Sequence, residues 1–523
     1  MQQIKRQGTV MLGKDKFFEV HRNQGIALTY DDVRLITGPS DYSPSEIDIT
    51  SHFSRNVELK VPIVSAAMDT VTESKMAIAM AKLGGLGVIH AGLSIEEQRR
   101  EVRRTKLHLN GIVEKPVTIS PDIQLREVET MRKQNDFDFR TFPVVNNEGK
   151  FIGILTGKDV EYAEDYSKTV AEAMTPATEV ITISARHKYD IQAIYDLMRQ
   201  HKISTLPVLN ENGEVASMFV FSDVKRVIAG NPDQYNLDEN GRLRVAAAVP
   251  TGEDGLARIE AMHKYLDVVV FDSAQGDSKY ARQSLRDARK LLDSMRSSIR
   301  EAKDAFNDID IVVGNISSPQ SVRELVIDEV DGIKVGQGPG SICTTRSETG
   351  IGMPQVTAVY EIAREAEKVA YEENRKPIPI CADGGITNRG DISIAIAAGA
   401  HSVMIGSKLA GTDEAPGKVI YDSGRQVKKY RGMGSPSAIR DSAASRKRYD
   451  IEESGVMLAE GVEAIIPYVG SVATVVALQA QALRKSMSYC GAPNIEHHRK
   501  HTPFVRITDK GLRESHPHDV YVQ

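Results

Sequence analysis

The loop GQGPGSICTT, residues 336–345, places three glycines, three hydroxyl side chains and Cys343 within ten residues. A short β-branched strand, Ile333–Val335, leads directly into it. Glycine lets a backbone approach a ligand closely because no Cβ intervenes, whereas structural thiols usually behave as small core hydrophobes. The pattern predicts an active-site loop with Cys343 as nucleophile. An ordinary turn with an incidental cysteine is the alternative.

Short apolar segments of strand character alternate with helical segments, such as 72–83, 281–292 and 353–372. This alternation is typical of a parallel α/β fold, and eight strands predict a (β/α)8 TIM barrel. The eight predicted strands are Val61–Ala67, Leu86–His90, Leu243–Val249, Val268–Ser273, Ile309–Asn315, Ile333–Gly336, Ile378–Asp383 and Val403–Ser407.

Polar or glycine residues close most of these strands, among them His90, Asp272, Ser273, Asn315, Asp383, Gly384, Gly385, Gly406 and Ser407. Active sites of TIM barrels lie at the carboxyl ends of the strands, and phosphate often binds at the loops after strands seven and eight. Here those loops are 383–385 and 406–407. Their backbone N–H groups are suited to a phosphate dianion, so they predict a phosphorylated substrate.

The barrel pattern stops near Asn110 and resumes near Arg242. In between, one α/β unit is used twice: Val117–Ser120 recurs 64 residues later as Ile181–Ser184, and Pro143–Val144 as Pro207–Val208. We therefore expect a barrel of residues 1–112 and 231–523, with an inserted domain of residues 113–230 in the loop after the second barrel strand.

The insert resembles a tandem cystathionine-β-synthase (CBS, or Bateman) pair, a module that often binds adenine or guanine nucleotides. In such modules a Ser/Thr-x-x-Asp motif holds the ribose, and Thr156 with Asp159 match it. The second copy has Val220 ahead of Asp223, which leaves only one copy with the full motif. A structural insert without a ligand is an equal alternative.

Composition argues against several classes of protein. A net charge of −5 gives no basic surplus for nucleic acid, and three cysteines are too few for a disulfide framework. No apolar stretch reaches membrane-spanning length, and the first twenty residues lack the apolar segment of a secretory signal. We expect a cytoplasmic protein with no membrane partner.

Several motifs together resemble the IMP dehydrogenase/GMP reductase family over nearly the whole chain. The cysteine loop is the most specific of them. The others follow in the family's order: Leu28–Val33, Val64–Glu73, Ala382–Gly385, Lys429–Ser435 and the tail Gly511–Asp519.

The resemblance implies oxidation of IMP to XMP with NAD+. Cys343 would add to C2 of the base, hydride would leave to NAD+, and water would hydrolyse the thioimidate. This needs the thiolate, because the thiol is a poor nucleophile. Thr345 would assist at the sulfur, and Arg448 with Tyr449 would activate the water.

The family pattern also assigns binding roles. Asp383 would hold the IMP ribose and Asp272 the nicotinamide ribose, since a carboxylate accepts two vicinal hydroxyls well. The remaining implied cofactor residues are Ser273, Asn315 and Gly336. The implied substrate residues are Met68, Ser341, Gly384, Gly385, Gly406, Ser407, Tyr430, Gly432, Met433, Gly434 and Glu460. Helix capping by Asp383 and plain packing by the two methionines are the alternatives.

A monovalent cation, usually K+, is also implied by the resemblance. Its ligands would be backbone carbonyls of Gly338, Gly340 and Cys343, with Glu514, Ser515 and His516 from a neighbouring subunit. The family forms tetramers and octamers, so we expect a homotetramer or octamer.

GMP reductase, an NADPH-dependent deaminase of GMP, shares the cysteine loop and the phosphate loops and is the alternative enzyme. A mobile flap around 410–460 discriminates between them, because only the dehydrogenase needs an Arg-Tyr pair there. Arg448–Tyr449 favours the dehydrogenase. A nucleotide-sensing regulator without activity is the third hypothesis. Ala91–Gly92 departs from the bulkier family residues and leaves cofactor contacts on that side open.

Overall fold

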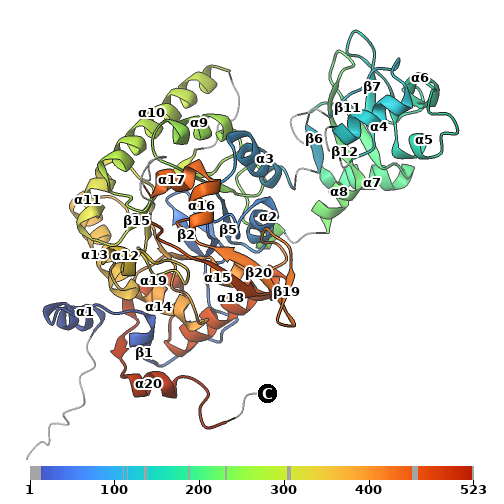
Figure 1. Ribbon diagram of the computed structural model, residues 1–523. Helices are drawn as coiled ribbons and strands as arrows, with labels where there is room; N and C mark the ends of the chain where they lie inside the picture. Colours follow the sequence, from blue (N-terminus) through green and yellow to red (C-terminus); the bar gives the residue numbers. More distant parts are fainter. Residues whose placement is uncertain are drawn as a thin grey trace, which may run out of the picture. The chain divides into compact units, whose positions relative to one another are not determined.

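The computed structural model describes residues 13–520, apart from 110, 115, 135, 136, 138, 187, 188, 230, 231, 303–307 and 450–457. The chain divides into two compact units (Figure 1). The larger consists of Met1–Lys106 and Asp233–Gln523, and the smaller of Leu107–Pro232.

The larger unit is built on a closed barrel of eight parallel strands, as the alternating pattern predicted. Around the barrel the order is β13-β14-β15-β16-β17-β18-β4-β5. All eight predicted strands form, although several are shorter than predicted. They are β4 Ile63–Ser65, β5 Leu86–Ile89, β13 Ala246–Val249, β14 Val268–Asp272, β15 Asp310–Ile316, β16 Gly332–Val335, β17 Ile380–Asp383 and β18 Ser402–Ile405.

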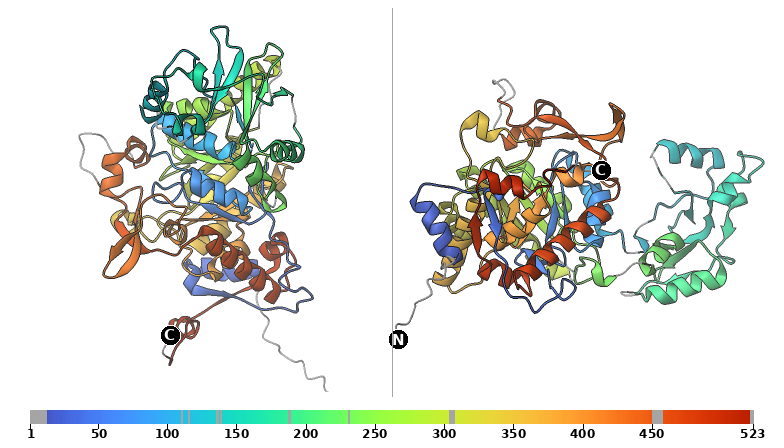
Figure 2. Two further views of the ribbon diagram at one scale, coloured as in Figure 1. Left: turned by 90° about the vertical axis from the view of Figure 1, so that its right-hand side faces the viewer. Right: turned by 90° about the horizontal axis from the view of Figure 1, so that it is seen from below.

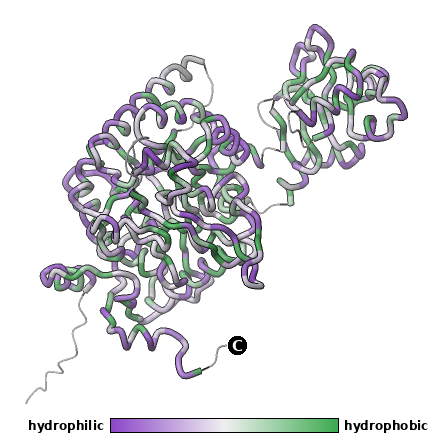
Figure 3. The backbone as a smooth tube through the Cα atoms, viewed as in Figure 1, coloured by the Kyte–Doolittle hydropathy of each residue, from purple (hydrophilic) through white to green (hydrophobic). Residues whose placement is uncertain are grey.

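Helices connect these strands and cover the barrel, which is why nearly every strand residue is buried on both faces. In Figure 3 the outer helices carry long polar stretches, such as that along α10. The covering helices are α2 Ser74–Lys82, α3 Ile95–Lys106, α9 Glu253–Met262, α10 Lys279–Ala302, α11 Gln320–Ile327, α13 Gln355–Glu372, α14 Gly390–Ala398 and α18 Val472–Tyr489.

A hairpin of β2 Ser51–Ser54 and β3 Val57–Leu59 covers the end of the barrel at which the strands begin. Strand β2 contacts β15, β16, β17 and β18. Helix α1 Lys14–Asn23 packs near β22 Phe504–Arg506, which pairs with β1 Val33–Leu35. Helix α19 Ile495–His501 packs on α14. In Figures 1 and 2 the tail with α20 Asp509–Glu514 projects away from the barrel.

A three-stranded antiparallel sheet lies between β18 and α18 in the chain: β19 Ile420–Asp422, β20 Arg425–Arg431 and β21 Glu463–Pro467. Short helices α15 Ser407–Ala410, α16 Pro436–Asp441 and α17 Ala443–Arg448 accompany it. Of these elements, β19, β20, α16 and α17 lie within the predicted flap of 410–460, and α15 and β21 flank it; residues 450–457 of the flap lie outside the described residues. The mobility of the flap stays a prediction.

The smaller unit repeats its strand pairing with the period seen in the sequence. Ile119 pairs with Val144 and Ile183 with Val208, both in parallel. In each copy a helix follows this parallel-paired residue. An antiparallel pair of strands comes next, and a second helix ends the copy. The first copy has α4 Leu125–Gln134, β7 Phe142–Val145, β8 Phe151–Leu155 and α5 Gly157–Glu161; the second has α7 Ile191–His201, β11 Thr205–Leu209, β12 Val215–Val220 and α8 Phe221–Ile228.

The attachment of the smaller unit differs from the sequence interpretation. The unit spans 107–232 rather than 113–230, and the chain enters it only after α3. A helix therefore separates the second barrel strand from the insertion, so the insertion point is the connection from α3 to β13 and not the loop that follows β5. Its identity as a CBS pair stays a prediction.

In the part of the chain that the structure describes, no helix is both long and apolar enough to cross a membrane.

Candidate active site

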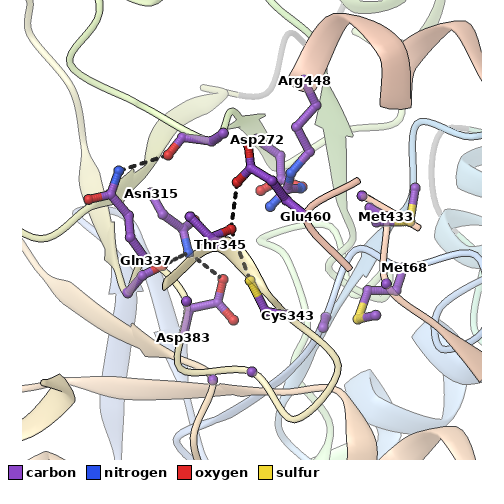
Figure 4. Close-up of a pocket in the computed structure, with 18 of the residues that line it drawn as sticks. Met68, Asp272, Asn315, Gln337, Cys343, Thr345, Asp383, Met433, Arg448 and Glu460 are labelled. Atoms are coloured by element: carbon purple, nitrogen blue, oxygen red, sulfur yellow. Dashed lines mark hydrogen bonds and ion pairs between the residues drawn. The ribbon is translucent and has the colours of Figure 1, made fainter. Parts of the chain in front are cut away.

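A cavity opens at the carboxyl ends of the barrel strands, where the glycine-rich loop follows β16 (Figure 4). It gathers most of the predicted site residues, although they are spread over nearly four hundred positions of the sequence. Those that line it are Met68, Asp272, Ser273, Asn315, Gly336, Gly338, Gly340, Cys343, Thr345, Asp383, Gly384, Tyr430, Gly432, Met433, Gly434, Arg448, Tyr449 and Glu460.

Cys343 starts a chain of polar contacts inside this cavity. Its Sγ lies 3.2 Å from Oγ1 of Thr345, and that hydroxyl donates to Oε2 of Glu460 at 2.6 Å (Figure 4). Backbone contacts fix the chain as well, because the N–H of Thr344 donates to the Glu460 carbonyl. Sulfur, hydroxyl and carboxylate thus form a path along which a proton can leave the sulfur or a nearby water.

The other two cysteines have different surroundings. Cys381 lies in β17 with no exposed surface, and burial raises the pKa of its thiol to about 12. Burial also raises the pKa of Cys490 to about 11. Only Cys343 is half-buried in a cavity lined by polar side chains. Its place agrees with the role of nucleophile.

A buried lysine that the sequence analysis missed lies at the floor of the cavity. Lys334, in β16, is 1% exposed, and its Nζ donates to Asp383 Oδ2 at 2.6 Å and to Asp272 Oδ1 at 2.9 Å. It also contacts Asn315, whose amide nitrogen donates to Asp383 at 3.0 Å. One cation therefore joins the two carboxylates predicted to hold the two riboses. The sequence signal that could have identified Lys334 is its position as the one charged residue within the short strand Ile333–Val335.

Arg448 and Tyr449 reach the same cavity from the end of α17. Arg448 forms an ion pair with Asp272 Oδ2 and lies 5.8 Å from the centroid of the Tyr449 ring. Burial raises the pKa of Tyr449, and the neighbouring guanidinium only partly offsets this, so the phenol stays protonated. A Cβ at Gly434 would lie 2.8 Å from the Tyr449 ring, which explains the glycine.

The loops predicted to bind phosphate, and the implied substrate residues Ser341 and Tyr430, divide between this cavity and a second one. Ser341, Gly385 and Ser407 line a neighbouring cavity, which shares Gly338 and Pro339 with the first. Tyr430 lines the first, and burial raises its pKa to about 12, so it is a hydroxyl donor at neutral pH.

Gly406 lines neither cavity but adjoins the first. A Cβ there would lie 2.9 Å from the Tyr430 hydroxyl oxygen, so a side chain at Gly406 would crowd the donor.

The residues predicted to bind a monovalent cation are placed in two groups. Gly338, Gly340 and Cys343 share the catalytic loop, whereas Glu514, Ser515 and His516 are exposed in the projecting tail. The described residues contain no group of three or more histidine, cysteine or acidic side chains arranged to hold a metal ion.

Comparisons with known proteins all find the same protein family. Residues 27–518 match the family model of the IMP dehydrogenase / GMP reductase domain. The inosine-5'-monophosphate dehydrogenase of Aquifex aeolicus is 41% identical over 509 residues, which cover 96% of this chain and 98% of the relative. That of Bacillus subtilis is 37% identical, covering 95% and 96%. A GMP reductase of Trypanosoma brucei, solved with guanosine 5'-monophosphate, has a TM-score of 0.79 at 37% identity and covers 96% of this chain and 100% of its own.

Proposed function

The chain belongs to the IMP dehydrogenase / GMP reductase family and is an IMP dehydrogenase-type oxidoreductase, and we propose that it oxidises IMP to XMP with NAD+ through a covalent adduct on Cys343. The observation that supports this most is the presence of Arg448 and Tyr449 in one cavity with Cys343. A reaction that ends in hydrolysis needs groups that bind and activate water beside the sulfur.

In the first half-reaction the Cys343 sulfur forms a bond to C2 of the hypoxanthine ring. The C2–H bond breaks, and the hydrogen leaves with its electron pair. NAD+, when bound, accepts that hydride. Asp272 fits its ribose diol, because this carboxylate ends a barrel strand at the cavity and keeps one oxygen on Lys334. Its other oxygen pairs with Arg448 here, so the bound ribose and this flap position exclude each other.

In the second half-reaction water adds to C2 of the thioimidate, the C–S bond breaks, and XMP leaves. The water must lose a proton. Arginine is a poor base because a guanidinium keeps its proton far above neutral pH, and the guanidinium of Arg448 forms an ion pair with Asp272. We assign proton removal to Thr345, whose hydroxyl passes a proton to Glu460 over 2.6 Å. Arg448 and Tyr449 then hold the water.

Substrate is positioned by groups around the cavity. Asp383 would accept the IMP ribose hydroxyls while Lys334 holds its other side. The loops after β17 and β18, with Ser341 and Tyr430, would hold the phosphate. Met68, Met433 and Gly434 would contact the base.

A spectrophotometric assay tests the proposal. A mixture of IMP and NAD+ should develop the NADH absorbance band. A mixture of GMP and NADPH should keep its NADPH absorbance. The reverse outcome would establish a GMP reductase, which the similarity to the Trypanosoma enzyme keeps as the second candidate.

Arg448→Ala refines the assay. We expect it to slow hydrolysis far more than hydride transfer, so that a covalent adduct accumulates. An equal loss in both steps would remove the assigned role in holding water.

For the smaller unit we propose an adenine or guanine nucleotide at Thr156 and Asp159. In the structure these residues form a capping box, with the Thr156 hydroxyl 2.8 Å from Asp159 at the start of α5. Val220 has no such cap in the second copy. Equilibrium dialysis with ATP and GTP tests this, and Asp159→Ala should abolish binding. Unchanged binding in that variant would refute the motif's role.

We also propose that K+ binds the carbonyls of Gly338, Gly340 and Cys343 together with Glu514, Ser515 and His516 of an adjacent subunit in a tetramer or octamer. The tail's projection away from the barrel supports this (Figure 1). The cation would hold the catalytic loop in place.

A further inference from the structure

The barrel end remote from the active site carries two adjoining cavities rich in basic side chains. One, of about 750 Å3, lies beside the amino ends of β17 and β18, where Lys376, Pro379 and His401 precede the strands. The other, of about 340 Å3, lies between α1, α13 and α19. They share Glu367, Arg499 and Lys500.

Basic groups outnumber acidic ones around these cavities. Three acidic side chains line them: Asp15, Glu367 and Glu496. Six lysines and arginines do so: Lys14, Arg55, Arg364, Lys376, Arg499 and Lys500. Arg55 pairs at 3.6 Å with Asp331, which lies outside the lining, so five basic side chains face three acidic ones. This leaves an excess of two positive charges, although the whole chain is acidic with a net charge of −5.

The acidic side chains are already engaged. Arg499, with only 4% of its side chain exposed, pairs with Glu496 at 2.7 Å and with Glu367 at 3.5 Å. Lys500 pairs with Glu496 at 2.8 Å. Asp15 accepts the Tyr360 hydroxyl at 2.7 Å. Within the described ranges, no acidic side chain forms an ion pair with Lys14, Arg364 or Lys376.

Lys14 shows the consequence of this imbalance. Its Nζ donates to the Arg499 carbonyl at 2.6 Å and lies 5.5 Å from the centroid of the Tyr360 ring. Burial first, and then the charge of Arg499, lower the pKa of Lys14 from 10.5 to about 8. A half-buried ammonium without a carboxylate is costly, and an anion nearby would relieve it.

His401 adds a neutral donor. Its Nδ1 accepts the backbone N–H of Ile380 at 3.0 Å, and burial keeps the ring's pKa well below its usual value. The uncharged ring therefore carries its proton on Nε2. His401 is one of the residues that line the larger cavity.

We propose that this face of the barrel is a binding site for a multiply charged phosphate-bearing anion, held by Lys14, Arg364 and Lys376 and distinct from the active site at the opposite end. Two cavities that share three lining residues give room for more than one phosphate group. Guanidinium and ammonium groups recognise such groups through charge-assisted hydrogen bonds. The site stands independently of the proposed reaction.

Titration calorimetry of the full-length protein with pyrophosphate at low ionic strength tests the site. We expect the double variant Arg364→Met/Lys376→Met to weaken binding by about tenfold or more, because two charge-assisted contacts are lost. Lys368→Met is the matched control, since Lys368 lies on the same helix and pairs with Glu365. It should bind as wild type does, and the turnover of all variants should be unchanged.

Equal pyrophosphate affinity in the double variant and wild type would overturn the proposal. So would a change of oligomeric state in the double variant, seen by sedimentation, with pyrophosphate affinity unaffected; the face would then be an interface between copies of the chain.

Proton uptake gives a second readout. At about pH 8, bound pyrophosphate should raise the protonation of Lys14, which calorimetry in two buffers of different ionisation heat detects. Lys14→Met should abolish the uptake, and its persistence would remove Lys14 from the site. The charged and titratable groups that face this amine are Asp15, Tyr360, Arg364, Glu367, Glu496, His498, Arg499 and Lys500.

Discussion

The ion pairing of charged side chains differs between the two ends of the barrel. At the carboxyl end, Lys334 pairs with Asp272 and Asp383, and Arg448 shares Asp272. At the amino end, the buried Arg499 pairs with Glu367 and Glu496, but within the described residues the half-buried Lys14 and the exposed Arg364 form no ion pair with an acidic side chain. A buried charge is stable only when it is paired and hydrogen-bonded. Paired charges at one end hold groups in place for chemistry, and unpaired ones at the other leave room for an anion.

The largest expected effect comes from removing the sulfur at the carboxyl end. Cys343→Ala should lower turnover by about 10⁴-fold or more, because the covalent route is lost, while IMP still binds. Cys490→Ala is the control and should keep wild-type turnover. Wild-type rates in Cys343→Ala would show that the carboxyl end does not act through covalent catalysis.

Breaking the charge pairing at the carboxyl end should have the next largest effect. Lys334→Met leaves Asp383 without its cation and Asp272 with Arg448 alone, and removal of one partner of a buried pair costs about 3–5 kcal/mol. We expect kcat/KM to fall by about 10³-fold, with Lys334→Arg recovering part of it. Steady-state kinetics measure this, and circular dichroism separates it from unfolding. A fully active Lys334→Met enzyme would refute the pairing argument.

Glu460→Gln should have a smaller and more selective effect. It keeps the hydrogen bond to Thr345 but cannot take a proton, so hydrolysis should slow by about 10²-fold. Hydride transfer should change little, which a burst of NADH in stopped-flow absorbance would show. If the NADH burst and the steady-state turnover both decrease, Glu460 acts in the first half-reaction instead.

The smallest effect concerns stability at the amino end. The pKa of Lys14 is about 8 in the fold and 10.5 unfolded, so the unfolded chain binds more protons between these values. Lys14 thus destabilises the fold below about pH 8, and the penalty declines as the pH rises toward 10.5. Lys14→Met should therefore stabilise the protein more at pH 7 than at pH 10, as urea denaturation would show. Equal gains at both pH values would contradict this.

Much of the fold could be predicted because the barrel depends on local patterns. Short β-branched segments alternate with amphipathic helices, and parallel strands bring their polar carboxyl ends together whatever their separation in sequence. Residues as distant as Met68 and Glu460 were assigned to one site by the family resemblance, and the folded chain brings both to the lining of one cavity.

Contacts between side chains were harder to predict. Lys334 reads locally as one polar residue in an apolar strand, and only the closed barrel brings Asp272 and Asp383 to it. The ion pair of Arg448 with Asp272 also depends on tertiary structure. The insertion point was misplaced because the sequence repeat begins some residues after α3 ends, and periodicity does not identify the connecting segment.

The central claim is that Cys343 carries the substrate during turnover. Rapid-quench mass spectrometry of Arg448→Ala, mixed with IMP and NAD+, tests it most directly. We expect a purine nucleotide adduct on the peptide that contains Cys343, formed as quickly as NADH. NADH formation with that cysteine unmodified throughout would contradict it.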